Sequence, residues 1–176
     1  MKYYAIDVET TGLDPKESSL VSIGAVDIET GDTFYEECRI WDGAYVSQTA
    51  LKINGFSEVQ INDTDKPTES QMIANFFEWL QDKPMMIAQN SAFDRDFIAA
   101  AAERAGIKNP MSFRTIDIHS IVQVEMLKCN WKVPTNLSLN ECLKYLHLPK
   151  EPNPHNALTG AQCNASIFKL IVYGTS

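Results

Sequence analysis

Two carboxylates, placed one residue apart at the end of an apolar run, have the clearest chemical potential in this chain. Residues 3–12 read Tyr-Tyr-Ala-Ile-Asp-Val-Glu-Thr-Thr-Gly, a pattern that indicates a strand covered on both faces. Side chains alternate along a strand, so Asp7 and Glu9 share one face with Cα atoms about 7 Å apart. Two negative charges beside a core stay ionised when a positive charge neutralises them. A hard divalent cation bound by carboxylate oxygens satisfies this requirement.

Each candidate residue also has a purely structural interpretation. The first strand can end at Asp7 and leave Glu9 solvated in a loop. A carboxylate at a helix start, such as Asp94, is often a cap, and Asn90 suits a turn. By the same reasoning Phe93 belongs to a core, and His155 to a surface loop.

The elements expected around these residues are strands first and then strands alternating with helices. Further strands are expected at residues 20–28, 33–40, 85–88 and 114–118. Helices are expected at residues 47–51, 67–80, 94–105, from about 117 to 128, 138–147 and 154–173. Two of these helices carry the spacing of a capping box, Thr68 with Gln71 and Ser138 with Glu141.

This order of elements predicts an α/β fold in one domain, residues 1–176. The first three strands form an antiparallel meander, and parallel strands and flanking helices complete a mixed five-stranded sheet. Functional groups gather at strand ends in such folds, so the end of residues 3–12 is the expected position of the site.

The composition of the chain narrows the classes of function that we expect. The net charge of −8 argues against a broad basic face that grips duplex nucleic acid, although a small acidic metal site for strand ends stays compatible with it. The four cysteines show no metal-binding or redox spacing, so reduced thiols in a cytoplasmic protein are expected. No apolar run reaches the roughly 18 residues of a membrane span, so no membrane association is expected.

Three segments, taken in order, resemble the motifs of the DEDDh (DnaQ-like) 3′-to-5′ exonuclease family. They are Asp7-x-Glu9-Thr10-Thr11-Gly12, Asn90-x-x-Phe93-Asp94 and His155-x-Ala157-Leu158. The family includes the epsilon subunit of DNA polymerase III, RNase T and oligoribonuclease. The resemblance covers nearly the whole chain, and the ordered set is far more specific than any single motif.

The resemblance implies a ribonuclease H-like fold and hydrolysis of single-stranded DNA or RNA from the 3′ end with two Mg²⁺ or Mn²⁺ ions. In the family pattern Asp7 contacts both ions, Glu9 one ion and the terminal nucleotide, and Asp94 the second ion. His155 is then the general base. Two divalent ions suit in-line attack on a phosphodiester, because they stabilise both the attacking and the leaving oxygen.

The same resemblance implies a set of substrate contacts, with Phe93 stacked on the terminal base. Ile53-Asn54-Gly55 resembles a family segment that usually carries a histidine where Asn54 stands. The implied partner is a single-stranded 3′ end, with a DNA polymerase or a second copy of the chain as further candidates. The implied substrate-binding residues are Thr10, Thr11, Gly12, Leu13, Asn54, Asn90 and Phe93.

The third motif departs from the family pattern at Gly160, where an aspartate that binds metal is usual. A glycine has no side-chain oxygen, so activity is expected to fall, and Gly160→Asp is expected to raise turnover or metal affinity. Asn156 and Asn164 lie one turn to either side and are candidates to lend a neutral oxygen. Three explanations stay open: a weakened enzyme, an impaired module that binds strand ends, or a change specific to this chain.

Overall fold

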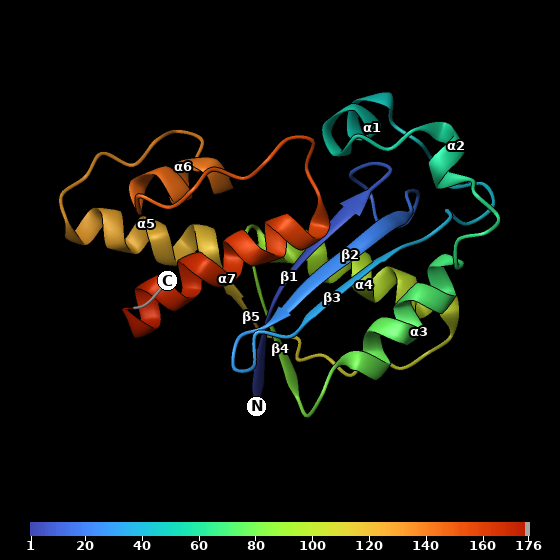
Figure 1. The fold of residues 1–176 in the computed structure, drawn as a ribbon, viewed down its shortest axis with the longest axis horizontal. Coiled ribbons are helices and arrows are strands. Elements are labelled where there is room, and N and C mark those ends of the chain that lie inside the picture. Colours follow the sequence, from blue (N-terminus) through green and yellow to red (C-terminus); the bar gives the residue numbers. More distant parts are fainter. Residues whose placement is uncertain (175–176) are drawn as a thin grey trace.

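A five-stranded mixed sheet with strand order β3-β2-β1-β4-β5 forms the centre of this computed structural model, which describes residues 1–174 (Figure 1). The central strand β1 pairs antiparallel with β2 and parallel with β4, and β2–β3 and β4–β5 continue these directions. The predicted meander and mixed sheet are therefore confirmed. The strands are β1 (Lys2–Thr10), β2 (Leu20–Asp27), β3 (Thr33–Glu37), β4 (Pro84–Ala88) and β5 (Thr115–Asp117).

Seven helices are described, and most of them follow the predicted segments. They are α1 (Gln48–Asn54), α2 (Glu58–Ile61), α3 (Glu69–Trp79), α4 (Ser91–Ala105), α5 (Ile118–Lys128), α6 (Leu139–Tyr145) and α7 (Ala157–Tyr173). The capping box of Thr68 and Gln71 opens α3 as predicted. The short α2 was not predicted, and α7 begins three residues later than expected because residues 151–156 form an irregular segment.

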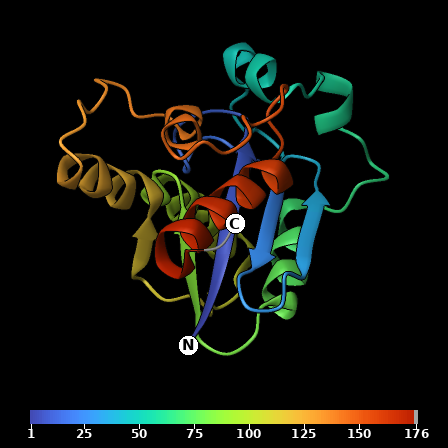
Figure 2. The same cartoon turned by 60° about the vertical axis from the view of Figure 1, so that its left-hand side comes forward.

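The alternation of β1 separates two cores. Tyr4, Ile6 and Val8 pack with side chains of α3 and α4 on one face. Ala5 packs on the other face with side chains of α5, α6 and α7. In Figure 2 the ribbon of α7, in red, lies in front of the sheet. Because odd-numbered side chains of β1 point to the second face, Asp7 lies on the side covered by α7.

Helix α7 lies unusually close to the sheet, and two glycines permit this approach. Gly24 of β2 pairs with Asp7 of β1, and a Cβ atom at Gly24 would overlap the backbone of Ala157. A Cβ atom at Gly160 would overlap the Asp7 carboxylate. The position of Gly160 therefore faces Asp7, and a side chain there requires the Asp7 carboxylate to move.

Within residues 1–174, every helix falls short of the length and apolar character that crossing a membrane requires.

Candidate active site

Three predicted carboxylates meet where β1 ends against α4. Asp7 and Glu9 come from β1, and Asp94 comes from the first turn of α4. Asp94 is 2% exposed, and its Oδ1 accepts a hydrogen bond from the N–H of Val8 (3.1 Å). The helix cap is Asn90, in a left-handed conformation, so the interpretation of Asp94 as a mere cap is wrong. Asp94 instead connects α4 to the strand between Asp7 and Glu9.

A fourth carboxylate, Glu151, adds its charge to this group. Together Asp7, Glu9, Asp94 and Glu151 are called the acidic cluster below. Burial raises the pKa of Asp7 well above its usual range, and the charges of Asp94, Glu9 and Glu151 raise it further. Burial, followed by the charges of Glu151 and Asp94, raises the pKa of Glu9 from 4.5 to about 8. Burial raises the pKa of Asp94 to about 7. Among residues 1–174 no Lys or Arg counteracts these pKa shifts, so the cluster holds protons or requires an added cation.

The donor set of the cluster fits a divalent cation. All of its donors are carboxylate oxygens, which suit Mg²⁺ and Mn²⁺, and their burial without a Lys or Arg partner disfavours the metal-free ionised state. In the described part of the chain, no three Asp, Glu, His or Cys side chains already stand in a coordinating arrangement. The carboxylates therefore have to turn toward one another when a cation binds.

Asp7, Glu151 and His155 line one cavity of about 590 Å³, here called the first cavity. The Nδ1 atom of His155 lies 3.9 Å from Glu151 Oε2, and the His155 side chain is 41% exposed. Its backbone N–H donates to the carbonyl of Ile53 (3.2 Å), which ties the loop before α7 to α1. The structure thus places His155 beside the acidic cluster rather than on a remote surface.

A second cavity of about 650 Å³ begins at Glu9 and extends under α1. Its apolar lining includes Leu13, Ile53 and Phe93, and the Phe93 ring packs on Phe97 with centroids 4.8 Å apart. Thr10, Gly12 and Asn54 line the same cavity. Asn90, by contrast, lines the first cavity.

Two of the predicted substrate-binding residues have hydrogen-bond partners within the protein. Thr11 is fully buried, and its hydroxyl donates to the carbonyl of Tyr45 (2.7 Å). The side-chain amide of Asn54 donates to the carbonyl of Thr10 (3.1 Å), and its oxygen accepts from the N–H of Phe56 (3.1 Å). Both side chains therefore hold the loops around β1, and Thr11 lines neither cavity.

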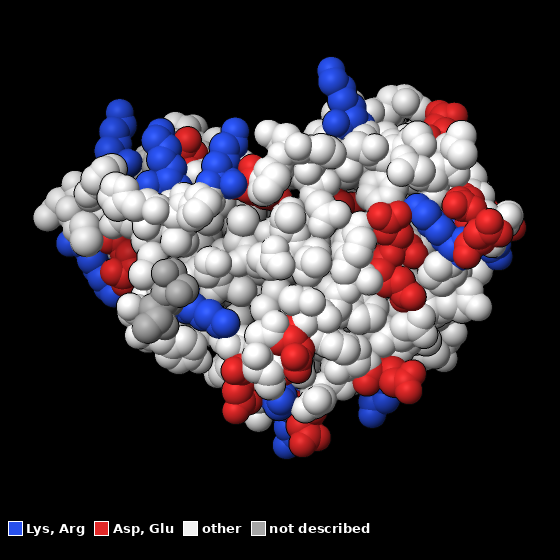
Figure 3. Space-filling view, viewed as in Figure 1, with Lys and Arg blue, Asp and Glu red and all other residues white. Residues whose placement is uncertain are grey.

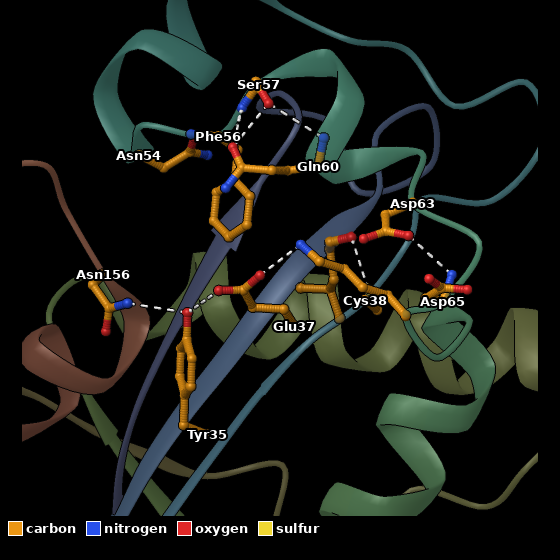
Figure 4. A network of polar contacts seen from close by, with 12 residues as sticks. Tyr35, Glu37, Cys38, Asn54, Phe56, Ser57, Gln60, Asp63, Asp65 and Asn156 are labelled. Carbon is orange, nitrogen blue, oxygen red and sulfur yellow. Dashed lines mark hydrogen bonds and ion pairs between the residues drawn. The ribbon is translucent and has the colours of Figure 1, made fainter.

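Asn156 caps α7 and fixes its position on the sheet. Its side-chain oxygen accepts from the N–H groups of Leu158 and Thr159. Its amide nitrogen donates to the hydroxyl of Tyr35 (3.0 Å), which in turn donates to Glu37 (2.8 Å), as Figure 4 shows. The oxygen of Asn156 is thus occupied, and the expectation that it lends an oxygen to metal is wrong.

Asn164 lies one turn after Gly160 and is completely buried. Its amide nitrogen donates to the carbonyl of Ile6 (3.3 Å), and its oxygen has no hydrogen-bond donor within residues 1–174. Asn164 therefore joins α7 to β1 directly beside Asp7.

The sequence analysis missed several residues that line the first cavity. Asp117 caps α5 and also accepts from the N–H of Ser91 (2.9 Å), which positions the start of α4. His119, which had no partner pattern in the sequence, bonds Gln123 (3.2 Å) and lines this cavity. Glu151 carried no local signal beyond an acidic residue four positions before His155. For Asp117 the sequence offered one signal of a functional role, an acidic residue near the end of a predicted strand.

The surface above these cavities is notched between the parts of the chain that hold α6 and α1. Figure 3 shows Lys and Arg side chains projecting along the upper outline on both sides of this notch.

Comparisons with known proteins assign the chain to an exonuclease family. A family model described as an exonuclease (RNase_T) matches residues 4–168. Ribonuclease T of Haemophilus influenzae is 30% identical over 124 residues, which cover 60% of this chain and 53% of that protein. A PolC-type DNA polymerase III of Clostridium perfringens is 25% identical over 96% of this chain, but over only 11% of its own length. The structure of Escherichia coli exonuclease I in complex with a dT13 oligonucleotide superimposes with a TM-score of 0.81 at 17% identity, covering 97% of this chain and 40% of that one.

Proposed function

Because the chain belongs to the DnaQ-like 3′-to-5′ exonuclease family, we propose that it removes nucleotides one at a time from the 3′ end of single-stranded DNA or RNA. The observation that carries this proposal is the convergence of Asp7, Glu9 and Asp94, from two distant segments, on one buried position without a Lys or Arg. Members of this family generally depend on divalent metal ions. The match covers about half the length of the ribonuclease T relative, 53%, so the proposal concerns the exonuclease domain.

Asp7, Glu9 and Asp94 would hold two divalent ions, Mg²⁺ or Mn²⁺. When bound, such ions supply charge that stabilises the attacking and leaving oxygens at the phosphodiester. Asp94 keeps one oxygen on the N–H of Val8, which fixes its carboxylate relative to β1. His155, partly exposed at the mouth of the first cavity, takes the proton from the attacking water.

The second cavity is suited to the terminal nucleotide. Its apolar side chains, Leu13, Ile53 and Phe93, offer flat and aliphatic contact that any base can use. Glu9 lines this cavity and is also a member of the acidic cluster, so it would contact the terminal sugar. Thr10 and Gly12 complete this contact surface, Asn90 serves the first cavity, and Thr11 and Asn54 support the loops.

A second candidate function is a module that binds 3′ ends without cleaving them. Gly160 favours it, since a carboxylate is missing from α7. The PolC-type relative, matched over nearly all of this chain, supports a role beside a DNA polymerase in either case.

Incubation of a 5′-labelled single-stranded oligonucleotide with the protein and Mn²⁺ tests the proposal. We expect a ladder of products that shorten from the 3′ end, and no ladder with EDTA or with Asp7→Asn. Asp32→Asn, at the turn between β2 and β3, is the matched control and should cleave normally. Binding without shortening would favour the module, and parallel DNA and RNA substrates reveal the preferred sugar.

A further inference from the structure

Glu151 is a buried acid that no motif of the sequence explains. It lies in the segment between α6 and α7, and its side chain is 3% exposed. The backbone N–H of Glu151 donates to the side-chain oxygen of Asn140 (3.1 Å), which fixes this point of the segment against α6. The hydrogen bond to Asn140 therefore fixes the backbone at the residue whose carboxylate is buried.

The carboxylate of Glu151 has no partner that accounts for its burial. Within residues 1–174 it accepts no hydrogen bond, and the nearest cationic group is the His155 ring, whose Nδ1 is 3.9 Å away. A hydrogen bond requires a shorter distance. Because Glu151 lines the first cavity, its carboxylate is accessible to a group that binds there.

The same carboxylate faces the predicted metal ligands. Glu151 lines the first cavity together with Asp7. Its charge acts on both Asp7 and Glu9, and for Glu9 it is the largest influence after burial. Glu151 thus lines the cavity at the end of β1 from the segment between α6 and α7.

Position 160 carries no side chain, and a carboxylate there would have to displace the Asp7 carboxylate in the present packing. A Cβ atom there would overlap Asp7, because Gly24 allows the start of α7 to lie directly on the sheet. Asn156 and Asn164 then hold α7 in that position through bonds to Tyr35 and Ile6. Glu151, which precedes the helix, lines the first cavity together with Asp7.

We propose that Glu151 is a metal ligand that supplies a fourth carboxylate to the site of Asp7, Glu9 and Asp94, in place of a side chain at position 160. The proposal rests on the proposed function, since it assumes a divalent-metal site at the end of β1. It assigns the irregular segment before α7 a role in cation binding, and it explains how the chain tolerates Gly160.

Titration calorimetry with Mn²⁺ alone, in the absence of nucleic acid, tests this assignment. Glu151→Gln preserves the size of the side chain and removes its charge. We expect it to weaken binding of at least one Mn²⁺ by about tenfold or more, without lowering the melting temperature in EDTA. Glu141→Gln is the matched control, because Glu141 lies on α6 with a 41% exposed side chain that faces Lys144. It should leave Mn²⁺ affinity unchanged.

A second pair of variants separates metal binding from a role in orienting His155. In a His155→Ala background, Glu151→Gln should still weaken Mn²⁺ binding to the same extent. If Glu151→Gln instead leaves Mn²⁺ affinity intact and shifts only the pH profile of hydrolysis, Glu151 is a positioning residue for His155 and the proposal is overturned.

Asp7→Asn separates failure of this proposal from failure of the proposed function. Loss of Mn²⁺ affinity in Asp7→Asn, with normal affinity in Glu151→Gln, would overturn the role of Glu151 alone. Normal affinity in both variants would overturn the metal site itself.

Discussion

Two regions of this protein bury acidic side chains, and they neutralise them in opposite ways. Glu69, at the start of α3, is 3% exposed. Its two carboxylate oxygens accept from the Nε and Nη2 atoms of Arg104 at 2.8 and 2.9 Å, and Oε1 also accepts from the N–H of Leu20 (2.9 Å). A fixed, bidentate guanidinium thus satisfies this carboxylate completely.

The acidic cluster buries four carboxylates and has no such guanidinium. Its members repel one another, and burial raises the pKa of each of them. The fold evidently can place an arginine beside a buried acid, as α4 does for Glu69. The difference teaches that Glu69 is neutralised within the fold, whereas the acidic cluster is left with the charge that the proposed divalent cations would neutralise.

The comparison predicts opposite outcomes when one acid is neutralised. Asp7→Asn should lower the hydrolytic rate by about 10³-fold or more, because a metal ligand supplies several kcal/mol of transition-state stabilisation. The same change should keep or raise the melting temperature in EDTA, since it removes repulsion. A measurable loss of stability without loss of activity would show that Asp7, like Glu69, has a structural role.

Removal of the guanidinium should have the reverse effect. Arg104→Ala leaves Glu69 buried and unpaired, so we expect a loss of about 3–5 kcal/mol in the free energy of unfolding. Mn²⁺ affinity of the folded protein should not change. Arg95→Ala, which breaks the exposed pair with Asp96, is the control and should cost at most about 1 kcal/mol. Urea denaturation of both variants provides the measurement.

A side chain at position 160 should disturb the acidic cluster from the α7 side. Gly160→Ala adds a methyl group that overlaps Asp7, and we expect a loss of about 1–3 kcal/mol in stability despite the higher helix propensity of alanine. Mn²⁺ affinity should fall as well. Position 160 faces Asp7, so it meets the condition under which Gly160→Asp is expected to raise turnover or metal affinity, and that expectation stays a prediction. Gln162→Ala, on the exposed part of α7, is the control and should leave stability and Mn²⁺ affinity unchanged. Unchanged Mn²⁺ affinity in Gly160→Ala would contradict the close contact between position 160 and Asp7.

The stability contributed by the acidic cluster should also depend on pH. The pKa values of Glu9 and Asp94 are raised in the folded protein, to about 8 and about 7. Their contribution to stability is therefore complete below the unfolded values of 4.5 and 3.8 and is lost as the pH rises toward 8. In EDTA the melting temperature should fall by several degrees between pH 5 and 8, and saturating Mn²⁺ should reverse much of that fall. A profile that is flat in EDTA would contradict the burial of unpaired carboxylates.

Much of the architecture could be predicted from local patterns. The alternation in β1, the capping box of α3 and Gly106 after α4 each act within a few residues, so their signals are present in the sequence. The convergence of Asp7, Glu9 and Asp94 followed from the order of the motifs, and the placement of Asp94 beside Val8 agrees with it.

The remaining features depend on contacts between distant segments. Nothing local distinguishes Glu151 from a solvated loop residue, because its burial results from α6 and α7 closing around it. The cap formed by Asn156 and the overlap at Gly160 likewise result from how closely α7 approaches β2. Leu13 and Phe93 were assigned by resemblance, and the second cavity now gives them a common location.

The most direct test of the central claim is an anomalous difference map from a crystal soaked in MnCl₂. The account predicts peaks within about 2.5 Å of carboxylate oxygens of Asp7, Glu9 and Asp94. A map without peaks at the end of β1, with Asp94 turned away from Asp7 and Glu9, would contradict it.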